Sequence, residues 1–302
     1  MNDSDRFNLA TDELTVVDPI TIEVIRNSFS SIAAQMNQNL ARSAYTPIIY
    51  EMKDCSVAIF DRHIRLVGQS SGLPVFLGTL GPAVEAVVRD FNADDMSPGD
   101  VYLLNDSYIV GSHLNDVSVL SPIFLEGELI GFGATKAHWM DVGAMNPSSA
   151  TNSTEIYQEG YRLGPTRVFQ AGKPERNIVD FLTRNSRLPK AIWGDLQAQI
   201  AACRTGEREM QKLYRRFGIE TIDSASNEIF AQSEVAERAA VSRLPDGEWT
   251  AQGALDSWGP GGEPVPVVTT VTIAGNEMHV DLTGSSEQTP GCLNCGLQQT
   301  IA

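Results

Sequence analysis

The spacing of apolar residues along the chain predicts both long helices and short strands. Between residues 22 and 40 an apolar side chain recurs every three or four positions, which predicts a long helix ending before Pro47. Asp18-Pro19 precedes this run and is typical of a helix N-cap followed by a first-turn proline. The same periodicity predicts a helix over 79–91, whereas runs of β-branched and aromatic residues predict strands. The predicted strands cover residues 56–61, 64–69, 101–104, 117–124, 128–137, 248–256, 265–274 and 277–283.

The order of these elements predicts an α+β fold in three parts: a mixed strand-rich layer, a long helical segment and a C-terminal β-rich part. Residues 142–175 show little periodicity, and a loop of that length in a compact domain is usually functional. No closing helix or strand is predicted after Gly284, so we expect the last part to be incomplete at its C-terminal end. The predicted domains are an N-terminal α+β domain over 1–187, a helical segment over 188–245 and a β-rich segment over 246–302.

Composition and charge narrow the classes of function. The 302 residues are 42% hydrophobic and 20% charged, as in an ordinary globular protein. A formal net charge of −16 repels phosphate backbones and anionic membrane surfaces, so we expect no nucleic-acid partner and no membrane partner. Neither a membrane span nor a signal peptide is predicted. Four cysteines are too few for a disulfide scaffold, which favours a cytoplasmic location.

Two of the four histidines stand in parallel His-x-x-Asp motifs. His113 and Asp116 form the first motif, His138 and Asp141 form the second, and each lies at the edge of a predicted strand. Two imidazoles and two carboxylates at adjacent strand ends can converge on one cation, and this set suits Zn²⁺, Mn²⁺ or Fe²⁺ better than Mg²⁺ or Ca²⁺. From spacing alone, however, a histidine hydrogen-bonded to a nearby aspartate without a metal is the commoner structure.

Other polar residues near the predicted strands have both a functional and a structural interpretation. Glu51 and Asp54 precede the first strand and can form an acid/base pair or supply a ligand, although solvated turn residues are the commoner outcome. Asn105 and Asp106 follow the strand over 101–104, where they can satisfy loop backbone groups or support His113.

Two further candidates are weaker. Arg187 can bind a phosphate or carboxylate through its guanidinium group, or pair with Asp195, which can alternatively cap a helix. Cys292 and Cys295 have CxxC spacing but lack the two further ligands of a closed zinc site. The sequence has no GxxxxGK[ST] or GxGxxG phosphate-binding loop, so any ATP is expected to bind to another chain.

The order and spacing of these motifs resemble the hydantoinase B/oxoprolinase family along nearly the whole chain. One departure is the segment 144–148, which lacks the glycine-rich sequence expected after the second histidine motif, and another is that family chains are considerably longer. The matching positions are Glu51, Asp54, Ser56, Ala58, Phe60, Asp61, Gly99, Asp100, Asn105, Asp106, Tyr108, Gly111, His113, Leu114, Asp116, Ala137, His138, Asp141, Gly143, residues 155–160, Asn185, Arg187, Pro189, residues 194–196, Ala198, Gln199 and residues 281–285.

The resemblance implies a metal-dependent B-type component of an ATP-dependent hydrolase of cyclic amides or imides. A hydantoinase A-like ATPase partner would bind ATP and Mg²⁺ and phosphorylate the substrate, and this chain would complete the reaction within a hetero-oligomer. The implied metal is Zn or Mn, with Fe less favoured. The implied roles are metal ligation by His113, Asp116 and His138, ligation or support by Asp141, acid/base work or ligation by Glu51 and Asp54, and substrate contact or ligand support by Asn105, Asp106, Glu159 and Arg187.

Two alternatives to cyclic amide hydrolysis remain from the sequence. The same machinery serves ketone carboxylation in acetone and acetophenone carboxylases, and no local motif separates that reaction from hydrolysis. A non-catalytic scaffold half of a split enzyme is the other alternative, and it predicts no bound metal.

Overall fold

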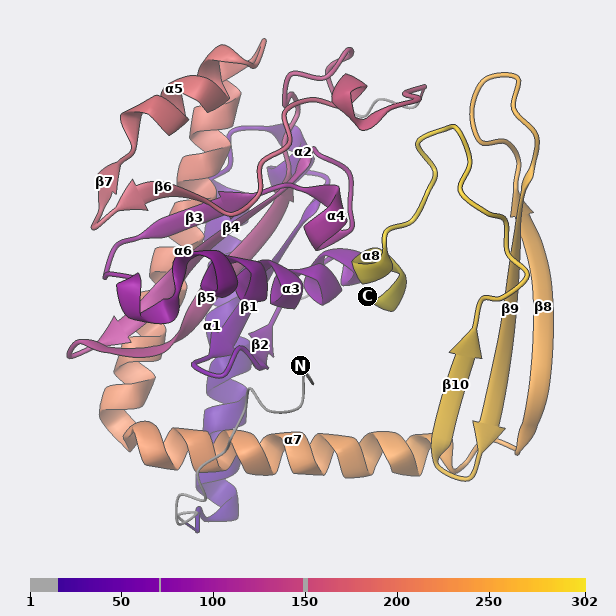
Figure 1. Cartoon of the computed structure of the whole chain (residues 1–302). Helices are drawn as coiled ribbons and strands as arrows, with labels where there is room; N and C mark the ends of the chain where they lie inside the picture. Colours follow the sequence, from indigo (N-terminus) through magenta and orange to yellow (C-terminus); the bar gives the residue numbers. More distant parts are fainter. Residues whose placement is uncertain (1–15, 71, 149–151) are drawn as a thin grey trace.

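The computed structural model describes residues 16–70, 72–148 and 152–302, so the first 15 residues of the predicted N-terminal domain lie outside the described part. A seven-stranded antiparallel sheet forms the centre of the main body (Figure 1). The α+β fold class is thereby confirmed. In spatial order the strands are β2 (Leu66–Gln69), β1 (Cys55–Asp61), β5 (Glu128–His138), β4 (Asp116–Leu125), β3 (Val101–Leu104), β6 (Thr166–Gln170) and β7 (Lys173–Pro174).

Helices cover both faces of this sheet. Helices α1 (Pro19–Ser43) and α6 (Pro189–Phe217) pack against one face, and α3 (Pro74–Phe91) packs against the other. Helix α1 begins as its sequence predicts, because the Asp18 carboxylate accepts the backbone N–H groups of Ile20 and Thr21 at 3.0 and 3.1 Å. The sheet is therefore the middle layer of three, and its buried strands position the candidate site.

Helices α1 and α6 approach each other closely where α6 carries Gly206. A Cβ atom at this position would lie 2.6 Å from Sδ of Met36 on α1, so the missing side chain permits the contact. The sequence pattern of α6 is interrupted at Gly206, yet the helix continues through it. The interruption marks a packing contact between helices rather than a break.

Several elements differ from the sequence predictions. Part of the predicted loop over 142–175 forms β6 and β7, and the next segment forms α5 (Arg176–Arg184). The chain end also forms a short helix, α8 (Leu297–Ile301), where no closing element was predicted. Helix α8 contacts α3 and α4 (Ser107–Val110), so its position depends on tertiary packing.

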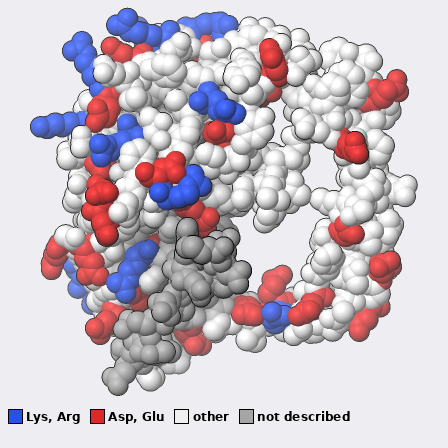
Figure 2. All heavy atoms as spheres, in the orientation of Figure 1, with Lys and Arg blue, Asp and Glu red and all other residues white. Residues whose placement is uncertain are grey.

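A second, three-stranded antiparallel sheet stands apart from the main body (Figure 1). It contains β8 (Gly247–Leu255), β9 (Val265–Ala274) and β10 (Glu277–Asp281), and helix α7 (Ile219–Val241) connects it to α6. No Lys or Arg follows Arg243 in the sequence, and Figure 2 shows acidic side chains scattered over α7 and this sheet. Among the described helices, none is both long and apolar enough to cross a membrane.

Candidate metal centre

The β4–β5 hairpin brings the two histidine motifs together. Asp116 is the first residue of β4, His138 is the last residue of β5, and the two are paired across the antiparallel ladder. Oδ1 of Asp116 lies 3.2 Å from Nδ1 of His138 and 3.1 Å from Nε2 of His113, which is on the loop after α4. One potential ligand atom from each of the three residues lies within 4.8 Å of the others. We call these three residues the ligand cluster.

The ligand cluster is buried on one side and open on the other. Asp116 and His138 are 2% and 5% exposed, whereas the side chain of His113 is 38% exposed. Burial alone would raise the pKa of Asp116, but its hydrogen bonds to His113 and His138 lower that pKa to about 2. Burial would lower the pKa of His113, yet the hydrogen bond to Asp116 raises it above the usual histidine value. An ionised carboxylate thus stands between two imidazoles, with access from the His113 side.

A second carboxylate, that of Asp54, lies beside the ligand cluster. Its Oδ2 atom lies 3.8 Å from Nδ1 of His138, and its backbone carbonyl accepts the His138 backbone N–H at 3.1 Å. Burial raises the pKa of Asp54 above its usual range, against the opposing effect of His138. Within the described residues, Oδ1 of Asp54 and Nε2 of His138 are buried without a hydrogen-bond partner. Such orphaned atoms are costly, and a bound cation or substrate group is one way to satisfy them. Glu51 is exposed after α2 (Pro47–Tyr50) and lies outside the cluster.

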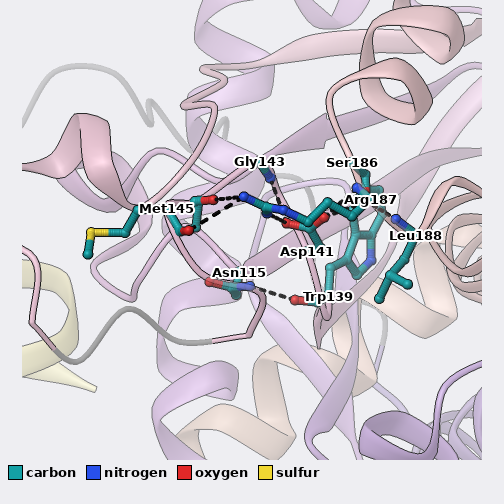
Figure 3. Close-up of polar contacts among 9 residues, drawn as sticks. Asn115, Trp139, Asp141, Gly143, Met145, Ser186, Arg187 and Leu188 are labelled. Atoms are coloured by element: carbon teal, nitrogen blue, oxygen red, sulfur yellow. Dashed lines mark hydrogen bonds and ion pairs between the residues drawn. The ribbon is translucent and has the colours of Figure 1, made fainter.

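Asp141, for which the resemblance implied either metal ligation or support, is not one of the three residues of the ligand cluster, and its carboxylate faces Arg187 and Ser186 (Figure 3). Its carboxylate is fully buried and accepts hydrogen bonds from Nη1 of Arg187 at 2.9 Å and from the Arg187 backbone N–H at 2.5 Å. The backbone N–H of Gly143 and the hydroxyl of Ser186 donate to the same carboxylate at 3.1 and 3.2 Å. Both oxygens are used, so Asp141 anchors the chain after β5 to the segment before α6.

Arg187 donates hydrogen bonds to the loop that follows β5. Besides the pair with Asp141, Nη2 donates to the carbonyl of Ala144 at 2.8 Å (Figure 3). Asp195, its possible partner from the sequence, instead accepts the hydroxyl and the backbone N–H of Thr46 at 2.7 and 3.1 Å. Arg187 therefore fixes the loop beside the site, and Asp195 fixes the start of α2.

Asn105 and Asp106 support the loop that carries His113. Nδ2 of Asn105, which is fully buried, donates to the Leu114 carbonyl at 2.7 Å, next to His113 in the chain. The Asp106 carboxylate accepts the backbone N–H of Tyr108 at 3.0 Å and caps the first turn of α4. Both residues thus bind backbone groups of the loop or of α4, and the Leu114 carbonyl bound by Asn105 adjoins His113 in the chain.

Glu159 approaches the cluster from the long loop. It is partly buried and accepts a hydrogen bond from the Ser153 hydroxyl at 2.7 Å. Its charge also contributes to the raised pKa of His113, after the larger effects of burial and Asp116. Glu159 is thus a charged group on the partly open side of the site.

The sequence interpretation missed Lys136. This residue is fully buried in β5, two positions before His138, and burial lowers its pKa to about 8. The available signal was a lysine within a strand that is otherwise apolar or uncharged from Leu129 to Ala137. A buried lysine is rare unless its ammonium group has a structural or chemical partner.

The fold and the ligand cluster define an α+β protein with a candidate mononuclear His/Asp metal centre. The family model described as hydantoinase B/oxoprolinase matches residues 18–302. The chain therefore belongs to the hydantoinase B/oxoprolinase family.

Three individual proteins illustrate this relationship. The chain is 35% identical over 285 residues to the B component of a putative D-/L-hydantoinase from Pseudomonas sp. (strain NS671), covering 91% of this chain and 48% of that protein. The crystal structure of ATP-dependent caprolactamase from Pseudomonas jessenii matches with a TM-score of 0.88 and 30% identity, over 95% of this chain and 49% of that one. A nucleotide-free acetone carboxylase structure shares the fold, with a TM-score of 0.82 and 21% identity over 89% of this chain and 38% of that one. The chain thus spans about half the length of the first two relatives.

Proposed function

We propose that this chain provides the metal-dependent part of an ATP-dependent cyclic amide or imide hydrolase. A hydantoinase A-like ATPase partner would bind ATP and Mg²⁺ and phosphorylate the substrate, and the B-type chain would complete the reaction in a hetero-oligomer. Family membership and the likeness to an ATP-dependent caprolactamase support the reaction class. The observation that carries the proposal is the convergence of His113, Asp116 and His138 within 4.8 Å.

The donor set fits a divalent transition metal. Two imidazole nitrogens and one buried carboxylate would hold the ion, and Asp54 would supply a further oxygen from the same side of His138. Mixed nitrogen and oxygen ligands suit Zn or Mn, with Fe less favoured. When bound, such an ion supplies Lewis-acid polarisation of a substrate oxygen and a lowered pKa for water.

The residues themselves provide positioning and access. Asp116 and His138 lie on adjacent strands of a rigid hairpin, so their separation is set by the sheet register. His113 is partly exposed, so substrate would approach from its side, where Glu159 also lies. Asp141 and Arg187 would hold the loop after β5, the strand that ends at His138, and thereby influence substrate choice.

Asp54→Asn is expected to weaken Zn²⁺ or Mn²⁺ binding roughly 10- to 100-fold, because an amide is a poorer ligand than a carboxylate. The measurement is metal affinity by chelator competition on the folded variant. Glu51→Gln is the matched control, since Glu51 is exposed and lies outside the cluster. If Asp54→Asn retained its metal and lost only turnover, Asp54 would carry a proton rather than bind the ion.

Reconstitution with an A-type partner tests the reaction. We expect cyclic amides or imides to be opened only when this chain, the partner, ATP and the divalent metal are all present. Ketone carboxylation remains the second candidate, because acetone carboxylase shares the fold at a TM-score of 0.82. A product that forms from ketones and requires bicarbonate would favour that candidate and contradict hydrolysis.

A further inference from the structure

Lys136 is on β5, the strand that carries His138, and it binds the segment that leads to His113. It lies on β5 two residues before His138, so both side chains project from the same face of the strand. The residue is fully buried, although an ammonium group in the protein interior has a high desolvation cost. Such a residue requires partners that offset this cost.

The Lys136 ammonium group joins three elements. Nζ donates to Oγ1 of Thr79 on α3 at 2.9 Å and to the backbone carbonyl of Val110 at 3.3 Å. It also lies 5.4 Å from the ring centroid of Phe76, one turn earlier on α3. The Thr79 hydroxyl donates to the Phe76 carbonyl at 3.0 Å, which leaves its oxygen directed to accept from Lys136. The ammonium is therefore held between β5, α3 and α4.

The contact with Val110 determines where the His113 loop begins. Val110 is the last residue of α4, and the carbonyls in the last turn of a helix have no partner within the helix. Gly111 follows with φ of 71°, in the left-handed region, and the chain turns there. His113 is three residues after Val110 in the sequence. A lysine bound to the Val110 carbonyl thus fixes the near end of the segment that places His113.

We propose that Lys136 is a positioning residue for the metal centre. From β5 it holds the Val110 carbonyl, and through it the His113 loop, at the separation from His138 that cation binding requires. The part of this proposal that concerns metal affinity rests on the proposed function. The part that concerns loop order does not, because it can be measured on the metal-free protein.

Whether removal of Lys136 weakens or tightens Zn²⁺ binding distinguishes a positioning role from a purely electrostatic one. A buried cation near the ligands repels a divalent ion, so if Lys136 acted only through its charge, its removal would tighten Zn²⁺ binding. If Lys136 positions the loop, its removal weakens binding despite the lost repulsion. We expect Lys136→Met, which preserves the aliphatic stem, to raise the Kd for Zn²⁺ roughly 10-fold or more.

The experiment combines Zn²⁺ affinity by chelator competition with amide hydrogen exchange of residues 110–116 in the metal-free chain. Lys136→Met is compared with Lys173→Met, which removes an exposed lysine on β7. Thr79→Val removes the hydroxyl that accepts from Lys136, and Thr79→Ser retains it. We expect faster exchange over 110–116 and weaker Zn²⁺ binding in Lys136→Met and Thr79→Val, and wild-type behaviour in Lys173→Met and Thr79→Ser.

Unchanged exchange over 110–116 in a folded Lys136→Met variant would overturn the proposal, as would tighter Zn²⁺ binding. If that variant did not fold, the comparison of Thr79→Val with Thr79→Ser would decide in the same way. If the wild-type chain bound no Zn²⁺ at all, the proposed function would fail. Amide hydrogen exchange of residues 110–116 would still test whether Lys136 orders the His113 loop.

Discussion

The double substitution His113→Ala/His138→Ala is expected to abolish stoichiometric metal binding while the chain stays folded. Two of the three clustered ligands are lost, and Asp116 with Asp54 leaves two carboxylates, fewer than the three protein ligands of a typical catalytic zinc site. Without the two imidazoles the buried Asp116 carboxyl can bind a proton instead of remaining charged, so the fold is expected to survive at reduced stability. Elemental analysis of the purified proteins and far-UV circular dichroism measure the two effects.

The matched control is His63→Ala/His279→Ala. It removes the two remaining histidines of the sequence, which lie outside the cluster, and it is expected to retain the wild-type metal content. Equal metal content in both double variants would contradict the site. A wild-type chain without metal, alone and after reconstitution with a partner, would instead favour the non-catalytic scaffold hypothesis.

The aspartates of the two His-x-x-Asp motifs are expected to respond in opposite ways to substitution by asparagine. Asp141→Asn places an amide group where the backbone N–H of Arg187 and its guanidinium now donate, so hydrogen bonds are lost and Arg187 loses its ionised partner. We expect the free energy of unfolding to fall by about 2 kcal/mol, less than for a fully buried pair because Arg187 is half exposed. Metal content is expected to remain at the wild-type level.

Asp116→Asn is expected to show the reverse pattern. It removes the carboxylate between His113 and His138, so metal binding should be largely lost. Urea denaturation of the metal-free proteins and elemental analysis of the folded variants would separate the two aspartates. Loss of metal in Asp141→Asn, with unchanged stability, would instead assign this carboxylate to the metal and contradict its pairing with Arg187.

Local sequence patterns were sufficient for the elements whose apolar faces belong to the main core. Helix α1 and strands β3, β4 and β5 follow their predicted spans closely, because each has a continuous apolar or β-branched pattern. The predicted loop over 142–175 was partly wrong. Strand β6 contributes only Val168 and Phe169 to the buried core, which is too short an apolar pattern to predict a strand. It is a strand because it pairs with β3.

In the candidate site, too, the sequence predicted some features and the tertiary structure decided others. The motifs singled out His113, Asp116 and His138, because histidine and aspartate at strand ends are suitable metal ligands. Spacing alone assigned Asp116 and Asp141 equivalent roles, whereas sheet pairing places Asp116 opposite His138 and Asp141 beyond the end of β5. Asp54 and Lys136 gain their positions from segments distant in the sequence, which no local pattern reports.

The sequence by itself determined the α+β class, the main elements, the resemblance to the family and the residue types of a candidate metal centre. These follow from periodicity and from motif spacing, which are local properties of the chain. The tertiary structure alone decided which carboxylates face the histidines, which one pairs with Arg187 and how a buried lysine reaches the His113 loop. Those outcomes depend on strand register and on packing between distant segments, because both bring together groups that the linear order keeps apart.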